Sequence, residues 1–277
     1  MIELTILIPA HNERGTLNAL TQRLLRVLET VKVNHEILFV DDGSTDTTLD
    51  ELRLLAQQHA SIRVLALSRN FGKEAALAAG LDHAQGAAVI IMDADLQQPP
   101  ELIPAMIAKW REGFATVYGA RIDRHSDSAL RRFVSQGFYR LFGRISKTTL
   151  PEGAGDFRLI DRKVVEALRR LPERARFTKG LYAWVGFNAT SIPYDHVDRE
   201  AGHSQWGFKR LFSLALDGVT AFSTAPLRVS TYAGLIISLG AFAYGLYFIT
   251  KTIVLGIDVP GYQIGRASCR ERVLMPV

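Results

Sequence analysis

Two aspartates separated by a single residue, Asp93 and Asp95, directly follow an apolar run in this 277-residue chain. In an extended segment, residues two apart point to the same side, so both carboxylates could converge on one cation. Mg²⁺ and Mn²⁺ combine a few protein oxygens with phosphate oxygens, which two carboxylates and a diphosphate would supply. Gln97 could add an oxygen, and Pro99-Pro100 then turns the chain away. We interpret this segment as a metal and diphosphate site rather than an ordinary Asp-rich turn.

Three other segments contain residues of the types that hold nucleotides. Asp42 follows Asp41, and because adjacent carboxylates repel, one of them is expected to find a donor such as a base N–H or a ribose hydroxyl. Asn12 and Glu13 allow the same interpretation, although both segments are also compatible with helix caps. Arg69 and Lys73 could offset phosphate charge, or could be solvated surface residues.

A second group of residues could serve an acceptor. Asp156 follows Gly155 in a segment that we expect to be a flexible loop, where it could orient an acceptor or take its proton. A simple glycine turn is the alternative. Arginine favours bidentate phosphate contacts. Further phosphate contacts are therefore expected from Arg131 and Ser135, on a helix expected at 128–145, and from Arg199 and Ser204.

The elements that must position these residues alternate along the first part of the chain. Short apolar runs predict strands, and helical spacing of leucines and other apolar residues predicts the segments between them. The expected strands are 4–9, 36–40, 63–67 and 87–92, and the expected helices are 16–31, 47–58, 73–84 and 101–111. This pattern indicates a parallel sheet covered on both faces. Ligands of such sheets bind beyond the carboxyl ends of the strands, where the polar clusters fall.

Residues 229–250 carry no charge and are bracketed by Arg228 and Lys251. This stretch is long enough to cross the hydrocarbon core of a bilayer, and a buried core helix is the less favoured alternative. The preceding segment, 205–228, mixes Phe and Leu with Lys and Arg and is expected to lie at the membrane interface. Its basic residues place the N-terminal region in the cytoplasm, whereas Lys251 favours the opposite orientation.

The net charge of +5 fits a partner that carries phosphate, such as a nucleotide, an anionic lipid or nucleic acid. Nucleic acid is not expected, because the sequence lacks an aromatic–basic surface pattern or a known binding module. The single cysteine, Cys269, excludes an intramolecular disulfide and a multi-cysteine metal cage. We therefore expect the chemistry to take place at a reducing, cytosolic face.

Six segments resemble the motifs of family-2 glycosyltransferases, in the same order. Within that family the chain resembles the polyprenyl-phosphate glycosyltransferases, which include bactoprenol glucosyltransferases and dolichyl-phosphate mannose synthases. The segments are PAHNE (9–13), FVDDGSTD (39–46), SRNFGKEAA (68–76), MDADLQQPPE (92–101), GDFRLIDR (155–162) and REAGHSQWGFKRL (199–211). The likeness runs from residue 1 to about residue 262.

The resemblance implies a GT-A fold, a Rossmann-like α/β architecture whose mostly parallel sheet has helices on both faces, followed by amphipathic and transmembrane helices. It also implies an inverting mechanism and a divalent metal, Mg²⁺ or Mn²⁺. The implied roles divide into three sets. The metal and diphosphate set is Asp93, Asp95 and Gln97, the nucleotide set adds Pro9, Ala10, Glu13, Asp42, Arg69 and Lys73, and the acceptor and diphosphate set is Arg121, Arg131, Ser135, Arg199 and Ser204. Asp156 matches the family's catalytic carboxylate, with Asp95 beside it in the reaction centre.

The function implied is transfer of a hexose from a nucleotide-sugar to polyprenyl (undecaprenyl) phosphate at the inner membrane. The motifs favour UDP-glucose as donor, and GDP-mannose and a UDP-linked modified arabinose stay open. A polysaccharide-extending relative would carry a Gln-x-x-Arg-Trp segment, which this chain lacks. A non-catalytic, membrane-tethered nucleotide-binding protein is the other alternative. A homo-oligomer in the membrane is compatible with these features.

We expect five regions along the chain. They are a cytoplasmic catalytic domain at 1–204, an interfacial segment at 205–228, a transmembrane helix at 229–250, a loop at 251–262 and a tail at 263–277. Two features depart from the family. Gln205 stands where Lys or Arg is usual, and the tail is polar and basic where relatives form a second transmembrane helix, so we expect the tail to be non-native.

Overall fold

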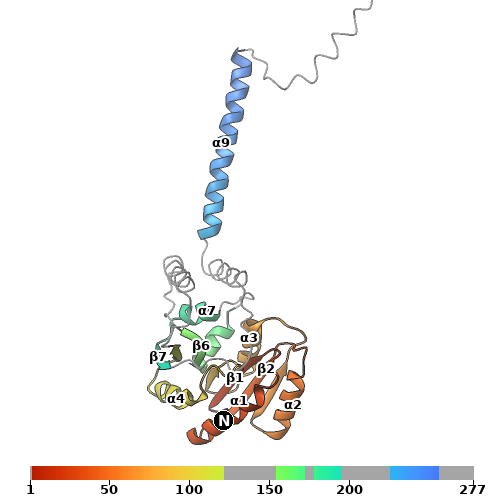
Figure 1. The fold of residues 1–277 in the computed structure, drawn as a ribbon. Coiled ribbons are helices and arrows are strands. Elements are labelled where there is room, and N and C mark those ends of the chain that lie inside the picture. The colour runs from red at the N-terminus through yellow and green to blue at the C-terminus, as the bar shows by residue number, and fades with distance from the viewer. Residues whose placement is uncertain (1, 122–153, 172–177, 195–224, 256–277) are drawn as a thin grey trace, which may run out of the picture. The chain divides into compact units, whose positions relative to one another are not determined.

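The computed structural model describes residues 2–121, 154–171, 178–194 and 225–255 (Figure 1). The chain divides into two compact units, Met1–Ser223 and Thr224–Val277.

A mixed, mostly parallel sheet forms the centre of the first unit. Its described strands lie in the order β3-β2-β1-β4-β6-β5-β7. Their bounds are β1 Leu4–Ala10, β2 His35–Asp41, β3 Ile62–Ala66, β4 Ala88–Ile91, β5 Thr116–Arg121, β6 Ala154–Asp161 and β7 Ala189–Tyr194. Among these strands, β6 alone runs antiparallel to its neighbours β4 and β5. The carboxyl ends of β1, β2, β3 and β4 therefore meet at one edge of the sheet.

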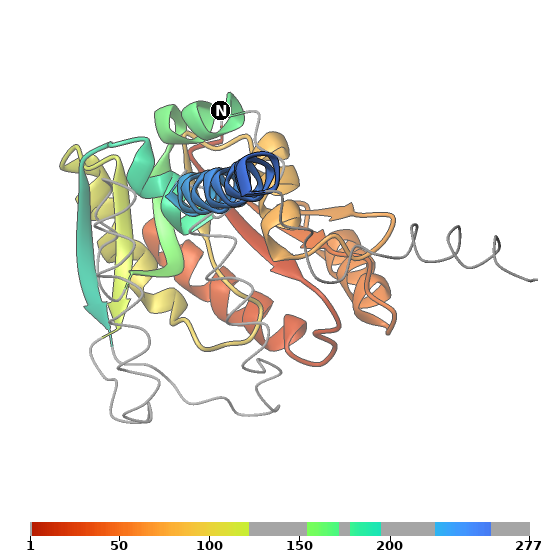
Figure 2. The same ribbon diagram turned by 90° about the horizontal axis from the view of Figure 1, so that it is seen from above.

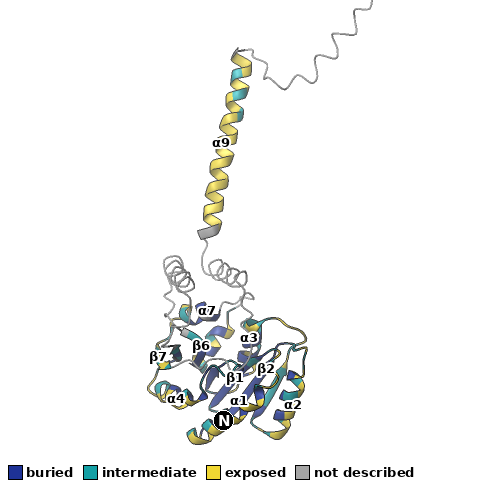
Figure 3. Cartoon of the chain, in the orientation of Figure 1, coloured by how far each residue is buried: buried dark blue, intermediate teal, exposed yellow. Residues whose placement is uncertain are grey.

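Helices cover both faces of the sheet (Figure 1, Figure 2). One face packs against α1 Leu17–Val31, α2 Thr48–Gln58 and α4 Ile103–Arg111, the last preceded by the 3₁₀ helix η1 Pro100–Leu102. The other face packs against α3 Lys73–His83, α6 Arg162–Arg169 and α7 Thr178–Trp184. Figure 3 shows the buried residues concentrated in the strands and on the inward sides of these helices.

Helix α1 illustrates how the sequence produces this packing. Leu17, Leu20, Leu24 and Leu28 recur at helical spacing, and all four are buried against the sheet. The helix ends at Val31 because the next residue adopts a left-handed conformation and its N–H bonds back to the Leu28 carbonyl. The first four expected strands and helices agree with the structure to within two residues at each end.

The second unit contains helix α9, Ala225–Leu255. Its segment Leu227–Val254 is long and apolar enough to cross a membrane, judged by length and composition, and its large apolar side chains are exposed (Figure 3). The helix includes residues 225–228, expected in the interfacial segment, and 251–255, expected in the loop. The helix is longer than the uncharged stretch between Arg228 and Lys251 because long basic side chains are good helix formers. The membrane-spanning bounds 229–250 stay a prediction.

Candidate active site

The Lys73 ammonium lies between two carboxylates from different strands. Lys73 is the first residue of α3, and its Nζ is 2.6 Å from Asp93 Oδ1 and 2.7 Å from Asp156 Oδ2. Asp93 follows β4, and Asp156 lies in β6. Each of the three side chains is partly exposed, so the cluster is open to a ligand. The structure thus brings together three residues that were predicted separately for the site.

The charges in this cluster change the proton affinities of its members. Burial by itself would lower the pKa of Lys73, but the charges of Asp93 and Asp156 outweigh it and hold that pKa above its usual range. Burial raises the pKa of the Asp93 carboxyl against the opposing effect of Lys73, and the charges of Asp156 and Asp95 raise it further. A raised carboxyl pKa means that the ionised form is disfavoured, so additional positive charge here would be stabilising.

Asp93 and Asp95 are not joined by an extended segment. Strand β4 ends at Ile91, the chain turns at Ala94 and Asp95, and Leu96 has a positive φ of 61°. The expectation that an extended backbone places both carboxylates on one side is therefore wrong. The turn instead brings the two carboxylates near each other, so that the Asp95 charge helps to raise the pKa of the Asp93 carboxyl.

Gln98 holds Asp93 in place and was not among the predicted site residues. Its Nε2 donates to Asp93 Oδ2 at 3.0 Å, and its Oε1 accepts from the Asp93 N–H at 2.9 Å. Gln97, which was predicted, donates its backbone N–H to Asp95 Oδ1 at 3.2 Å. The left-handed Leu96 folds the chain back and brings residue 98 to Asp93, which simple spacing could not reveal.

The described residues fit a divalent cation. Asp93 and Asp95 supply hard carboxylate oxygens, and the Lys73 ammonium shows that positive charge is accommodated beside Asp93. Within the described ranges, no group of three or more His, Cys, Asp and Glu side chains is arranged to hold a metal by itself. Mg²⁺ and Mn²⁺ suit such a site, because they keep water and take phosphate oxygens as ligands.

Asp156 lies at an irregularity of strand β6, not in a flexible loop. Between the paired positions Tyr118–Arg158 and Ala120–Ala154, β5 advances by two residues while β6 advances by four. Such a bulge redirects side chains near binding sites. The loop expectation was wrong because Gly155 suggested a turn, whereas pairing with distant β5 keeps the segment in the sheet.

Asp42 is held by the loop that leads into α3. Its Oδ1 accepts from the Phe71 N–H at 2.8 Å and its Oδ2 from the Gly72 N–H at 2.9 Å. The neighbouring carboxylate, Asp41, accepts from the Ser44 N–H through Oδ2. Its other oxygen is buried with no hydrogen-bond partner among the described residues. Both carboxylates therefore have hydrogen-bond donors from the protein: Asp42 has two backbone N–H groups, and Asp41 has one.

Hydrogen bonds join the loops after β1, β2 and β3. His11 Nδ1 lies 3.0 Å from the Asp42 carbonyl oxygen, and Asn70 Nδ2 lies 2.9 Å from His11 Nε2. Because the Asn70 amide nitrogen donates, Nε2 accepts and Nδ1–H donates to the carbonyl. Asn12 has a φ of 56°, and its side-chain oxygen accepts from the Thr45 N–H at 2.9 Å. His11, Asn12 and Asn70 thus lie at this edge, where polar residues were expected beyond the strand ends.

The other predicted nucleotide residues lie along the same edge. Pro9 and Ala10 end β1, and the Ala10 carbonyl accepts from the Asp42 N–H at 2.9 Å. Glu13 donates its backbone N–H to Thr48 Oγ1 at 3.0 Å. The Arg69 guanidinium lies 4.1 Å from the centre of the exposed Phe71 ring.

Four of the predicted acceptor residues fall outside the described ranges. They are Arg131, Ser135, Arg199 and Ser204. Arg121 is the last residue of β5, where it pairs in register with Tyr194 of β7. The structure therefore places the nucleotide side of the predicted site and only one position of the acceptor side.

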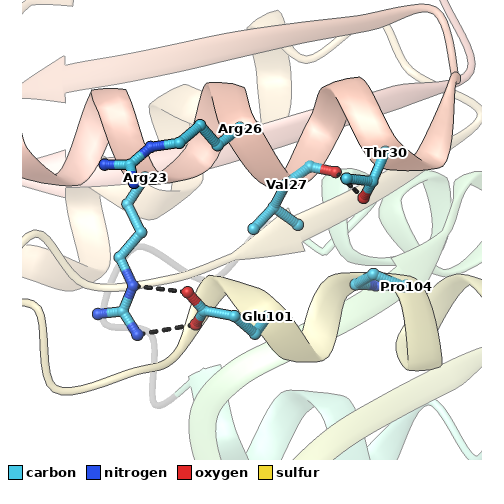
Figure 4. A pocket seen from close by; sticks show the side chains of 6 residues that line it. All are labelled: Arg23, Arg26, Val27, Thr30, Glu101 and Pro104. Atoms are coloured by element: carbon cyan, nitrogen blue, oxygen red, sulfur yellow. Dashed lines mark hydrogen bonds and ion pairs between the residues drawn. The ribbon is translucent and has the colours of Figure 1, made fainter.

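A separate hollow of 330 Å³ lies on the outer surface of the first unit, between α1 and the η1–α4 segment (Figure 4). Its lining residues are Arg23, Arg26, Val27, Thr30, Glu101 and Pro104. Arg23 bonds to both carboxylate oxygens of Glu101, at 2.7 and 2.8 Å. None of the predicted site residues lines this hollow.

The sheet, its helices on both faces and the carboxylates at the strand ends define a glycosyltransferase of the GT-A fold. The chain belongs to glycosyl transferase family 2, whose model matches residues 5–169. It is 50% identical over 261 residues to an uncharacterised glycosyltransferase of Synechocystis, covering 94% of this chain and 82% of that protein. It is 42% identical to the bactoprenol glucosyl transferase of Shigella phage SfV, covering 94% and 85%.

A solved structure confirms the fold at lower sequence identity. It is a mannosyltransferase from Pyrobaculum calidifontis in complex with GDP-Man and Mn²⁺, which is 18% identical. The match covers 91% of this chain and 80% of that one, with a TM-score of 0.52.

Proposed function

We propose that this glycosyltransferase transfers glucose from UDP-glucose to a polyprenyl phosphate, with inversion at the sugar carbon. The observation that carries the proposal is the 42% identity to a bactoprenol glucosyl transferase over 94% of the chain. The acidic cluster at the strand ends supports it, because Asp93 and Asp156 meet at one ammonium where a nucleotide-sugar diphosphate would bind. Helix α9 supports membrane attachment. The basic residues Lys209, Arg210 and Arg228, which precede the apolar stretch, favour a catalytic unit on the cytoplasmic side.

In this proposal, Asp93, Asp95 and Gln97 hold a divalent cation together with the donor's diphosphate. The cation, when bound, would neutralise charge that develops on the diphosphate leaving group. Lys73 lies against Asp93 and adds positive charge to the same place. The nucleoside would lie at the edge formed by the carboxyl ends of β1 and β2 and the loops that follow them, where Pro9, Ala10, Glu13 and the unpartnered Oδ1 of Asp41 are found.

Asp156 would orient the acceptor phosphate. A phosphate monoester has a second pKa near 6 and is largely ionised at neutral pH, so it needs little help to lose a proton. A carboxylate held by Lys73 at 2.7 Å is well fixed for orientation. Arg121, Arg131, Ser135, Arg199 and Ser204 are proposed to supply contacts to the acceptor and diphosphate.

A comparison of three acceptors, each supplied separately, tests this function. Membranes containing the protein would be given radiolabelled UDP-glucose with undecaprenyl phosphate, with undecaprenol, or with a soluble glucan. We expect label in the organic phase with the phosphate alone, because the phosphate oxygen is the attacking group. Label transferred to the glucan instead would contradict the proposed acceptor.

A further inference from the structure

Three strands send carboxylates to the start of α3. Asp42, Asp93 and Asp156 follow or belong to β2, β4 and β6, and all three contact residues 71–73. Strand alternation explains the convergence at β2, where Leu38 and Val40 pack on the α3 face. Asp42 continues this alternation, whereas Asp41 faces the other way and bonds to Ser44.

The Asp42 carboxylate is buried and its two oxygens hold two consecutive backbone N–H groups. The side chain and backbone together are 4% exposed. The donors, Phe71 and Gly72, are the last two residues before α3, and Gly72 has a φ of 94°. A charge-assisted bond to a backbone amide is roughly twice as strong as a neutral one. Two such bonds fix both the position and the direction in which the helix begins.

The next residue after this anchored pair is Lys73. Its ammonium contacts Asp93 and Asp156 at once, at 2.6 and 2.7 Å, so its Cα must lie within side-chain reach of both carboxylates. The position of the ammonium therefore depends on the turn at residues 71 and 72, and that turn depends on Asp42.

We infer that Asp42 is a positioning residue that acts through the Phe71–Gly72 turn to hold Lys73 between Asp93 and Asp156. Its catalytic consequence rests on the proposed function of that cluster, whereas its effect on Lys73 does not. The rival role is direct contact with the nucleoside, which the sequence motif suggested. The two roles differ in what they change. A positioning residue changes turnover through Lys73, and a nucleoside ligand changes nucleotide affinity whether or not Lys73 is present.

The first arm of the test measures the ammonium itself. The intact chain in membranes or detergent is treated with an amine-reactive ester, and labelling of Lys73 is followed by peptide mass spectrometry. Lys109, which pairs with Glu112 on the surface of α4, serves as the internal reference. We expect Asp42→Asn to raise the labelling rate of Lys73 relative to Lys109 by about fivefold or more, because the amide NH2 group that replaces one carboxylate oxygen cannot accept from the N–H group it faces.

The second arm measures turnover. Asp42→Asn is expected to lower kcat about tenfold while leaving the KM for the nucleotide-sugar and the Kd for UDP within about twofold. In a Lys73→Met background the same substitution should lower kcat by less than about twofold, because the residue through which it acts is gone. Asp46→Asn is the matched control. Asp46 accepts from the N–H of Thr48, the first residue of α2, at 3.0 Å, so its effect should be the same in both backgrounds.

A second variant keeps the test valid if Asp42→Asn does not fold. Gly72→Ala strains the same turn, because its φ of 94° is unfavourable for alanine, yet it leaves the Asp42 carboxylate unchanged. It should also expose Lys73 to labelling and lower kcat without weakening UDP binding.

The outcomes separate the alternatives. Faster labelling of Lys73 in either variant, with unchanged UDP affinity, supports the positioning role even if the parent transfers no sugar, in which case only the proposed function fails. Unchanged labelling in a folded Asp42→Asn protein overturns the positioning role. A rise of tenfold or so in the Kd for UDP that persists in the Lys73→Met background also overturns it and assigns Asp42 to the nucleoside.

Discussion

Lys73 and Asp156 are 83 residues apart in the sequence, yet Lys73 Nζ donates to Asp156 Oδ2 at 2.7 Å. This contact joins the start of α3 to the bulged strand β6, and the same ammonium continues to Asp93 after β4. One side chain thus connects the carboxylate proposed for the metal with the carboxylate proposed for the acceptor.

Sugar transfer is expected to require a divalent cation held through Asp95. The Asp95→Ala protein should lose at least about a hundredfold in kcat, because charge on the diphosphate is then poorly neutralised. It should keep its thermal unfolding temperature, since Asp95 lies at a partly exposed turn. The measurement is lipid-extractable product with and without a chelator. Transfer at the untreated rate after chelation would show that no metal is needed.

Removal of the Lys73 charge should destabilise the metal-free protein. It should also increase the rise in unfolding temperature that a divalent cation produces. In Lys73→Met the carboxylates of Asp93 and Asp156 lose their shared partner, and the free energy of unfolding should fall by about 1 kcal/mol after allowance for solvent screening. Mg²⁺ or Mn²⁺ should then raise the unfolding temperature more than it does in the parent. Lys109→Met, which removes an exposed ion pair with Glu112, is the control and should show no added cation response.

The role of Asp156 can be read from the pH dependence of Asp156→Asn. If the residue orients an ionised phosphate, the variant should lose about tenfold to a hundredfold in kcat, and the loss should be nearly constant above pH 6 or so. An essential base would instead leave no activity at any pH. A rate that recovers as the pH rises in the variant would argue against the orienting role.

The conformation of the loops after β2 and β3 is expected to require glycine at position 43. Its φ is 61°, and an added Cβ would collide with the backbone of Arg69. We expect Gly43→Ala to lower the free energy of unfolding by about 2–4 kcal/mol, from backbone strain and overpacking together. Gly15→Ala is the matched control, because Gly15 also has a positive φ of 88° but no described atom within 4 Å of its Cβ position.

Alanine at either position would be strained by the positive φ. The difference in the free energy of unfolding between the two variants therefore measures the collision of the added Cβ at position 43 with Arg69. Gly15→Ala should cost about 1 kcal/mol, measured by denaturant unfolding. Equal losses in both variants would show that the loop after β3 can move away from Gly43.

The sequence predicted the first half of the sheet well because each strand and helix there has a strong local period. The leucines of α1 and the apolar run of β4 are examples. The carboxylates at the strand ends were also predictable, since parallel strands end at a common edge. Strand β6 was harder, because its place between β4 and β5 depends on distant partners and on a bulge that no local pattern reveals.

The partners of the site residues could not be obtained from spacing. Lys73 was predicted as a residue near phosphate, but its position between two carboxylates depends on how β4, β6 and α3 pack. Gln98 contacts Asp93 only because Leu96 reverses the chain. The roles of Asp41 and Asp42 likewise depend on which face of the sheet each side chain points to, and that follows from the register of β2.

The most direct test of the proposed function is transfer of label into lipid with a panel of donors. Radiolabelled UDP-glucose, GDP-mannose and a UDP-linked modified arabinose would each be incubated with the protein and undecaprenyl phosphate, alongside the Asp95→Ala variant. The account predicts an organic-extractable, metal-dependent product from UDP-glucose that is absent with the variant. Product from GDP-mannose alone would contradict UDP-glucose as the donor. Failure to form a lipid-linked product with every donor would contradict the proposed function.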